Sequence, residues 1–213
     1  MKGVEVLKKI RSGNLDLTLD ELKAEVDGYG QTVAHILAKK VYPQQERLIL
    51  FDVVDDKQLD SVLPISTPYG WSVLHQISES GEVVHLTDYR RKLYLSLREG
   101  EFGDTPLHVL ARSNPGKFLK TFSPYKDIQF YTVPNLYGDT PAHILSRLNY
   151  LEIPDTDDFL AILTSSNVNG ETVAEILFLN GKRFKNPKIL NLELSFLNRS
   201  IGEIQSYGER RAQ

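Results

Sequence analysis

One short motif recurs along the chain and restricts its fold more than any other feature of the sequence. The two best copies are Gly103–Ala111, which reads GDTPLHVLA, and Gly138–Ser146, which reads GDTPAHILS. Looser copies begin at Gly30, Gly70 and Gly170, so that successive copies are 40, 33, 35 and 32 residues apart. A period of this length indicates an array of stacked repeats.

Each copy carries the residues of a turn that opens a helix. Glycine permits a tight turn with a positive φ angle. The Thr or Ser that follows shortly after it supplies an N-cap oxygen for the first free amides of a helix. Pro106 and Pro141 fall at the first helical position, where a missing N–H costs nothing. Because apolar residues such as Leu107, Leu110 and Ala111 follow at helical spacing, each copy predicts a short helix.

The copies resemble the Thr-Pro-Leu-His signature of ankyrin repeats. In that family each unit is a hairpin-like finger followed by two antiparallel helices. The resemblance therefore implies an all-α fold with short β-like fingers, an ankyrin-like helical repeat solenoid. It covers roughly residues 1–200, but the second halves of the units match the family pattern poorly. We expect these segments to be rebuilt, shortened or extended: residues 41–66, 81–100, 114–134 and 149–166.

The repeats divide the chain into three parts. We predict an N-terminal capping half-repeat over residues 1–26, a repeat array over 27–200 and a C-terminal tail over 201–213. The units of the array start near residues 27, 67, 100, 135 and 167. Thr18–Glu21 reads as a capping box, which predicts a helix over about residues 18–26, and an unrelated helical extension is the alternative to the half-repeat. Glu175 replaces the motif histidine in the fifth copy, as expected for a unit that caps an array.

Segments outside the motif predict local structure of their own. The expected conformations are a helix over 32–40, a buried helix or a strand over Glu46–Val54, a short helix and then an extended piece over Val83–Leu97, a short helix over Lys117–Phe122, an extended finger or loop over Asp127–Val133, and a helix starting near Asp155 or Thr156 that buries Phe159, Leu160 and Leu163.

Composition narrows the class of function. A formal charge of −3 and a pI near 6.0 give no basic surface for nucleic acid or an anionic membrane. The chain has no cysteine, which excludes disulfide and thiolate chemistry. No stretch approaches the roughly 18–20 apolar residues that span a bilayer, and the first residues lack the apolar core of a signal peptide. We expect a soluble, cytoplasmic protein that acts inside a cell, with a host cell as one option.

Four of the five histidines occupy one motif position: His35, His75, His108 and His143. Equivalent side chains of stacked units lie about 8–10 Å apart, too far to share a zinc ion whose Zn–N distances are about 2.0–2.1 Å. The ankyrin resemblance implies instead that this histidine hydrogen-bonds the backbone and Thr of the turn and so ties units together. His85 lies outside the motif, without a paired ligand nearby in the sequence. We expect no metal and no cofactor.

A carboxylate follows the motif glycine in three copies, at Asp104, Asp139 and Glu171. Acid–base catalysis would need two of them in one cleft, whereas the repeat spaces them in a row. We expect them to be exposed, some accepting hydrogen bonds from Thr or from amides at the helix start. The sequence also has no phosphate-binding glycine loop, nucleophile elbow or zinc-protease motif. We therefore expect no catalytic residue.

An aromatic residue precedes the motif glycine in four copies. In the ankyrin family this position lies on the finger and faces the concave surface, and large rings dominate protein interfaces. The resemblance places the only tryptophan and the polar ends of the first helices on the same surface. The alternative is that the rings stack on one another and that the charges pair between neighbouring units. The predicted protein-binding residues are Tyr29, Gln31, Lys39, Tyr69, Trp71, Phe102, Asp104, Arg112, Tyr137, Asp139 and Arg147.

The resemblance favours a non-enzymatic module that binds another protein through its concave finger and first-helix face. Irregular repeat spacing suggests a viral or bacterial chain, such as an inhibitor or a host-directed factor. Two other classes stay open: a hydrolase-type enzyme that uses histidine and carboxylate groups, and a nucleic-acid-binding protein. We expect the partner to be a protein, with neither nucleic acid nor membrane bound.

Overall fold

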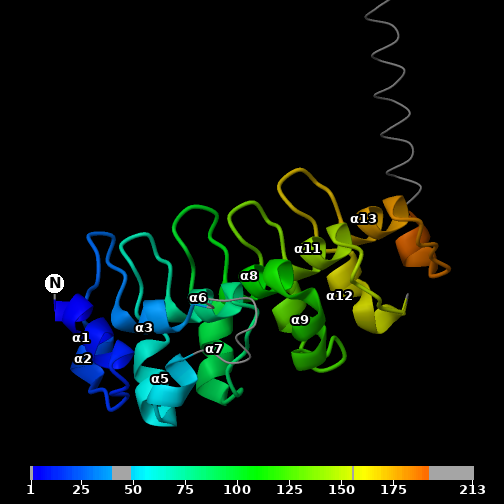
Figure 1. The fold of residues 1–213 in the computed structure, drawn as a ribbon. Coiled ribbons are helices and arrows are strands. Elements are labelled where there is room, and N and C mark those ends of the chain that lie inside the picture. The colour runs from blue at the N-terminus through cyan, green and yellow to red at the C-terminus, as the bar shows by residue number, and fades with distance from the viewer. Residues whose placement is uncertain (1, 40–48, 155, 192–213) are drawn as a thin grey trace, which may run out of the picture. The chain divides into compact units, whose positions relative to one another are not determined.

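The computed structural model describes residues 2–39, 49–154 and 156–191 of the 213-residue chain. Within these ranges the protein is all-α, as predicted, because its helices are joined by loops and its extended pairing consists of isolated antiparallel bridges. The chain divides into two compact units, residues 1–121 and 122–213, which we describe separately (Figure 1). The proposed boundaries of half-repeat, array and tail stay predictions, and residues 201–213 lie outside the described part.

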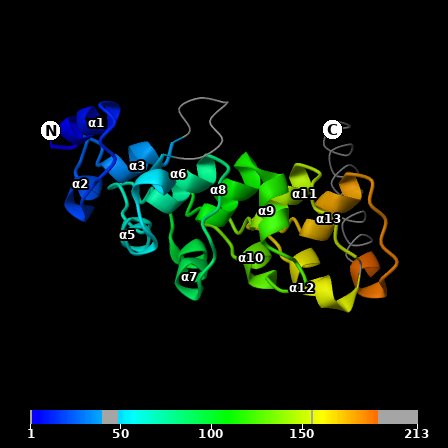
Figure 2. The same ribbon diagram turned by 60° about the horizontal axis from the view of Figure 1, so that its bottom comes forward.

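In unit 1 the helices are α1 (Lys2–Arg11), α2 (Leu19–Lys23), α3 (Val33–Leu37), α4 (Leu50–Val53), α5 (Asp56–Val62), α6 (Val73–Glu79), α7 (Asp88–Ser96), α8 (Pro106–Ser113) and α9 (Pro115–Thr121). The motif helices α3, α6 and α8 lie side by side in chain order (Figure 1 and Figure 2). Helix α2 packs against α3 and α5, and α8 packs against α7 and α9.

In unit 2 the helices are α10 (Ile128–Thr132), α11 (Pro141–Arg147), a 3-10 turn (Asp157–Phe159), α12 (Leu160–Leu163) and α13 (Val173–Leu179). The motif helices α11 and α13 pack on each other, and α10 packs against α11 and α12. In both units the motif helices are thus neighbours, and other helices pack against them.

The motif helices begin as the sequence predicts. Thr or Ser takes the extended N-cap conformation in every copy, and Pro106 and Pro141 occupy the first turn of α8 and α11. The histidine three residues later completes the cap, because its Nδ1 accepts the N-cap backbone N–H. These N···N distances are 3.2 Å from Thr32 to His35, 3.1 Å from Ser72 to His75, 3.1 Å from Thr105 to His108 and 3.2 Å from Thr140 to His143.

Two recurring hydrogen bonds join each motif helix to the next one within a unit. Because Nδ1 accepts, the ring proton sits on Nε2, which donates to a carbonyl of the following finger. These bonds are His35 to Trp71 O at 3.1 Å, His75 to Asp104 O at 3.0 Å and His143 to Glu171 O at 3.2 Å. At the other end of the helix, a side chain of the following repeat donates a hydrogen bond to a carbonyl of the preceding motif helix or its end. These bonds are Ser80 to Ala38 O at 2.8 Å, Ser113 to Ser78 O at 2.5 Å and Asn180 to Ser146 O at 2.7 Å. The tie expected of the motif histidine is confirmed at these three junctions.

Glu175 forms the same N-cap interactions as the motif histidine. Its carboxylate accepts the backbone N–H of Thr172 at 2.6 Å, and Thr172 Oγ1 accepts the N–H of Glu175 at 3.2 Å. The side chain is buried, with 2% of its surface exposed. A carboxylate at this position thus preserves the N-cap that the histidine forms in the other copies.

Each finger turns at the motif glycine. The five motif glycines have φ between 67° and 77°, as their spacing in the motif predicts. In the second finger, Gly70 N donates to Thr67 O at 2.9 Å and Thr67 N donates to Trp71 O at 3.0 Å, which is a hairpin turn closed by a glycine bulge. Neighbouring fingers are joined by backbone, since Gly100 N donates to Tyr69 O at 2.7 Å. The three fingers of unit 1 project on the same side of its motif helices (Figure 1).

The prediction of an extended finger over Asp127–Val133 is wrong, because this segment forms α10. Its alternating pattern resembles a strand, but no neighbouring strand is present among the described residues to pair with its backbone groups. A helical turn satisfies them internally and buries Phe130 and Tyr131 completely. The ring of Phe130 lies 4.8 Å from that of Phe122, and Tyr131 Oη donates to Phe122 O at 2.6 Å.

The order predicted over Val83–Leu97 is also wrong, since the extended piece precedes α7. Thr87 is the N-cap of this helix and accepts the N–H of Arg90 at 3.2 Å. The signal was present in the sequence as Thr87 followed by Asp88, a favourable pair at a helix start.

Other expected helices differ mainly in their ends. The capping box at Thr18 is confirmed, but α2 stops at Lys23 because Glu25 pairs with Thr32 in the first finger. Helix α3 is shorter than the predicted 32–40, and α4 occupies only the last part of Glu46–Val54, whose first residues lie outside the described part. A short helix near Lys117 is confirmed as α9. Phe159, just before α12, and Leu163 within it are buried as expected, whereas Leu160 is half-buried and Ile162 is fully buried.

Acidification should destabilise the fold through the motif histidines. Burial lowers the pKa of His35, His75 and His143 from the usual value, for His75 to about 4. A neutral ring therefore stabilises the fold fully above pH about 6.5, and this contribution is lost as the pH falls towards 4. We expect the urea midpoint of unfolding to be lower at pH 5 than at pH 7.5. His75→Gln should show a smaller decrease between these two pH values, and at pH 7.5 it should be less stable than the unsubstituted protein by about 1–3 kcal/mol. An equal pH dependence in His75→Gln would contradict this role.

A side chain at Gly70 should not be tolerated. Its φ is 77°, and a Cβ there would lie 2.7 Å from Arg98 O and 3.0 Å from Gly100 N. We expect Gly70→Ala to lower the free energy of unfolding by roughly 2 kcal/mol or more, measured by urea denaturation. Gly28→Ala is the control, because no atom lies within 4 Å of its added Cβ, and it should be close to neutral.

Candidate functional site

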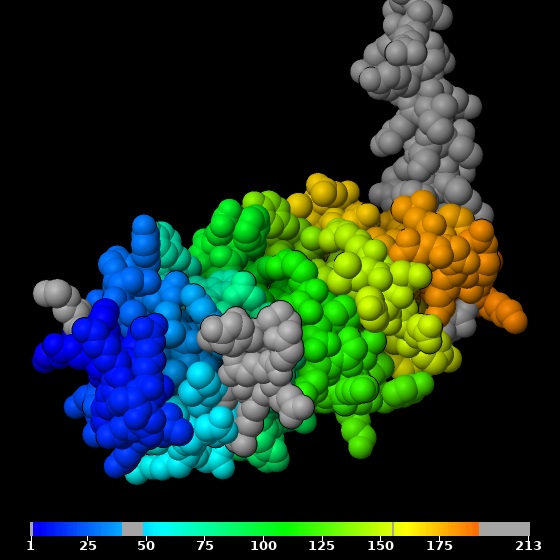
Figure 3. Space-filling view, in the orientation of Figure 1, coloured from blue at the N-terminus to red at the C-terminus, as the bar shows by residue number. Residues whose placement is uncertain are grey.

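The predicted aromatic residues lie at the finger tips and are exposed. Tyr29, Tyr69, Phe102 and Tyr137 expose 67%, 66%, 43% and 51% of their surface. In the space-filling view the loop tips of unit 1 protrude along one edge of the surface (Figure 3). Each ring therefore keeps a large part of its surface accessible to solvent.

The predicted polar residues form pairs that connect each finger to the end of its own motif helix. Lys39 Nζ donates to Gln31 Oε1 at 2.9 Å, and Arg112 Nη2 pairs with Asp104 Oδ2 at 2.9 Å. In unit 2 the guanidinium of Arg147 takes both oxygens of Asp139, at 2.7 and 2.9 Å. The expected pairing between neighbouring repeats is found once among these residues, between Arg147 and Glu171 at 2.6 Å.

The expectation that the motif carboxylates are exposed is wrong for Asp104, which exposes only 3% of its surface. A carboxylate can be buried there because Arg112 neutralises it. Asp139 is half-buried, and burial alone would raise its pKa. Hydrogen bonds from Arg147 and Asn167 outweigh this effect and lower the pKa of Asp139. These carboxylates therefore hold the guanidinium groups of Arg112 and Arg147 in place.

Five of the predicted residues line one hollow between the second and third fingers. It has a volume of about 690 Å³. One wall is the second finger, the other is the third finger, and α8 closes the base. The lining residues are Pro68, Tyr69, Trp71, Glu99, Gly100, Glu101, Phe102, Asp104, Val109 and Arg112. The walls are held at a fixed spacing by the backbone bond from Gly100 N to Tyr69 O.

Trp71 is oriented by side chains of α6. Its Nε1 donates to Gln76 Oε1 at 3.3 Å, and Gln76 Nε2 donates in turn to Glu79 Oε2 at 2.7 Å. The centre of its ring lies 5.3 Å from the ring of His75. The histidine that joins two repeats thus also supports the only tryptophan of the chain.

Glu99 shapes the third finger and was missed by the sequence reasoning. Its carboxylate accepts the backbone N–H groups of Glu101, Phe102 and Asp104 at 2.8, 2.5 and 3.1 Å. In three of the other four fingers an Asp or Asn three residues before the motif glycine accepts the equivalent N–H groups, whereas the second finger has Thr67 and the third has Gly100 at that position. The equivalent acceptors are Asp27, Asn135 and Asn167. The signal was the missing Asp or Asn at this position.

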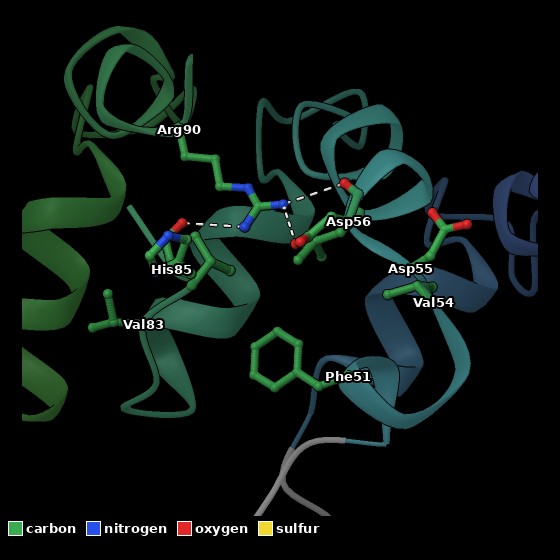
Figure 4. A pocket seen from close by; sticks show the side chains of 9 residues that line it. Phe51, Val54, Asp55, Asp56, Val83, His85 and Arg90 are labelled. Atoms are coloured by element: carbon green, nitrogen blue, oxygen red, sulfur yellow. Dashed lines mark hydrogen bonds and ion pairs between the residues drawn. The ribbon is translucent and has the colours of Figure 1, made fainter. Parts of the chain in front are cut away.

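A second hollow, of about 400 Å³, lies between α5 and α7 and is lined by none of the predicted residues (Figure 4). Arg90 enters it from α7 with 1% of its side chain exposed. Its guanidinium donates to Asp60 Oδ1 at 2.5 Å, to Asp56 Oδ1 at 2.8 Å and to the carbonyls of Asp56 and His85 at 3.2 and 3.1 Å. Burial alone would lower the pKa of Arg90, but its two carboxylate partners raise it. The group fastens α7 to α5, so we assign this hollow a structural role.

The described residues form neither a metal-binding cluster nor a membrane-spanning helix. No group of three or more His, Asp or Glu side chains among them is arranged to hold a metal ion. No helix in the described ranges is both long and apolar enough to cross a membrane. Both ring nitrogens of His35, His75 and His143 are engaged in the hydrogen bonds given above.

Comparison with known proteins gives no relative. No protein-family model matches the sequence, and a search of curated proteins finds no match. The interpretation of the site therefore depends on the repeated geometry of this chain.

Loss of the buried guanidinium should cost stability. We expect Arg90→Ala to lower the free energy of unfolding by roughly 3 kcal/mol, because α7 loses both its ion pairs and the packing of the arginine stem. Lys92→Ala, on an exposed position of the same helix, should change it by less than about 0.5 kcal/mol. Urea denaturation measures both, and equal effects would contradict the assigned role.

Proposed function

We propose that the protein is an ankyrin-like repeat array that binds another protein through its fingers and first helices, without catalysis of its own. The observation that supports this most is the exposed aromatic residue at one finger position in four copies, Tyr29, Tyr69, Phe102 and Tyr137. Each precedes a glycine at positive φ, so the backbone presents the ring at the tip of a turn.

Rings in these positions suit an interface. Tyr, Trp and Phe supply large contact areas at a low cost in side-chain entropy, and they are enriched among the residues that dominate binding. The turns that carry them are tied to their neighbours by backbone bonds, so little order has to be created on binding. The hollow between the second and third fingers adds a concave site to this row.

The two other classes have less support. An enzyme would need a histidine or carboxylate available for proton transfer, but three motif histidines use both ring nitrogens and the three motif carboxylates are paired with arginine. A nucleic-acid partner is disfavoured by a formal charge of −3. A cytoplasmic location and a role as an inhibitor or host-directed factor belong to the proposal as expectations from composition and repeat spacing.

Photo-crosslinking in cells that make the protein tests the proposal. A photoreactive phenylalanine, such as p-benzoylphenylalanine, would replace Tyr69 or Tyr137 and form covalent adducts with a bound partner on irradiation. We expect discrete higher-mass protein adducts from these two positions, because their rings lie at the proposed interface.

Two exposed tyrosines away from the finger tips are matched controls. Tyr150 exposes 51% of its surface, the same fraction as Tyr137, and Tyr125 exposes 69% against 66% for Tyr69. Adducts that form equally at all four positions, or at none of the finger positions, would show that the fingers are not the binding face.

A further inference from the structure

We infer that the hollow between the second and third fingers receives a basic side chain of the bound partner, best met by an arginine. This inference rests on the proposed function, since it names the chemistry of one group at the proposed interface. It is carried by two features of the lining residues, their aromatic rings and their charge.

Three aromatic side chains line the hollow: Tyr69, Trp71 and Phe102. Aromatic faces carry partial negative charge and attract a cation that lies over them, and tryptophan does so most strongly. A guanidinium group is planar and weakly hydrated, so it can lie flat on a ring. The pocket is also open to solvent on the side of the finger tips, as both Tyr69 and Phe102 are exposed, so a side chain can enter without rearrangement.

The charge of the lining has the matching sign. Three carboxylates, Glu99, Glu101 and Asp104, face a single cationic group, Arg112. Arg112 and Asp104 neutralise each other at 2.9 Å. Glu99 is held by three backbone N–H groups, which stabilise its charge without cancelling it. The hollow therefore keeps an excess of negative charge.

Glu101 is the carboxylate best placed to meet a ligand. It is exposed, and its side chain makes no ion pair within the described part of the chain. Arg98, the other nearby cation, donates to Gly103 O at 3.1 Å and does not line the hollow. An arginine between the rings can donate two hydrogen bonds to one carboxylate, a geometry that lysine lacks.

The test is a titration of the full-length ¹⁵N-labelled protein with N-acetyl-arginine methylamide, followed by NMR at low salt. The isosteric N-acetyl-citrulline methylamide is the neutral control, and N-acetyl-leucine methylamide is the apolar one. Because Trp71 is the only tryptophan, its indole N–H gives one unambiguous signal in the hollow. We expect the arginine compound to shift this signal and the amides of residues 69, 101 and 102, with an affinity at least about fivefold higher than that of either control.

Two variants test the lining. Glu101→Gln should weaken binding of the arginine compound about two- to fivefold through loss of one ion pair. Tyr69→Leu should weaken it by a similar factor through loss of one ring face. Glu152→Gln makes the same change of charge at an exposed position outside the hollow and should leave binding unaltered. The dispersion of the amide spectrum reports whether each variant is folded.

Equal binding of the arginine and citrulline compounds, tighter binding of the leucine compound, or no shift at Trp71 would each overturn the inference. The proposed function would survive these results if crosslinks from the finger positions still formed. Conversely, a charge-selective titration without crosslinks would leave the hollow as a site for basic groups and remove the proposed function.

Discussion

The neutral imidazole ring of the motif histidine is the interaction on which the rest of the structure depends. Its Nδ1 accepts the N-cap amide of its own helix, and its Nε2 donates to a carbonyl in the following finger. One side chain thus closes a helix, sets the distance to the next repeat and fixes the base of the next finger. The ring is buried, so each bond replaces solvation that the folded chain no longer has.

The finger positions follow from this tie. A finger held at its base by a histidine and along its edge by a backbone bond, as Tyr69 O is by Gly100 N, has a defined place for its tip. The positive φ of Gly70 turns the chain directly after Tyr69, which places that ring at the tip. Trp71 is positioned beside the hollow in a similar way, because His75, whose ring lies against it, fixes the start of α6. Residues that join the repeats thus also determine where the side chains of the fingers lie.

The motif made the first half of each repeat predictable, whereas the second halves were not. Thr140, Pro141 and His143 specify their helix through local chemistry, so their conformation could be read directly from the sequence. The segment that forms α10 has no comparable capping residues to specify a helix. Its helix results from burial of Phe130 and Tyr131 in unit 2, which depends on residues distant in the sequence.

The candidate site shows the same division. Tyr69, Trp71 and Phe102 were placed by the motif register, and the structure brings them to one hollow. The role of Glu99 depends on the absence of an Asp or Asn at Gly100, which only comparison between repeats reveals. The ion pairs of Arg90 with Asp56 and Asp60 could not be predicted, because these carboxylates lie about 30 residues away on α5.

The comparison of Glu175 with the motif histidines bears on the direction in which successive repeats are joined. The ties made by His35, His75 and His143 all run in one direction, from the ring of one copy to a carbonyl of the next. A carboxylate at position 175 preserves the helix start, because it still accepts the N-cap amide. The start of a motif helix and its tie to the next repeat are therefore separable, because the first needs only a hydrogen-bond acceptor at this position, whereas the second also needs a donor.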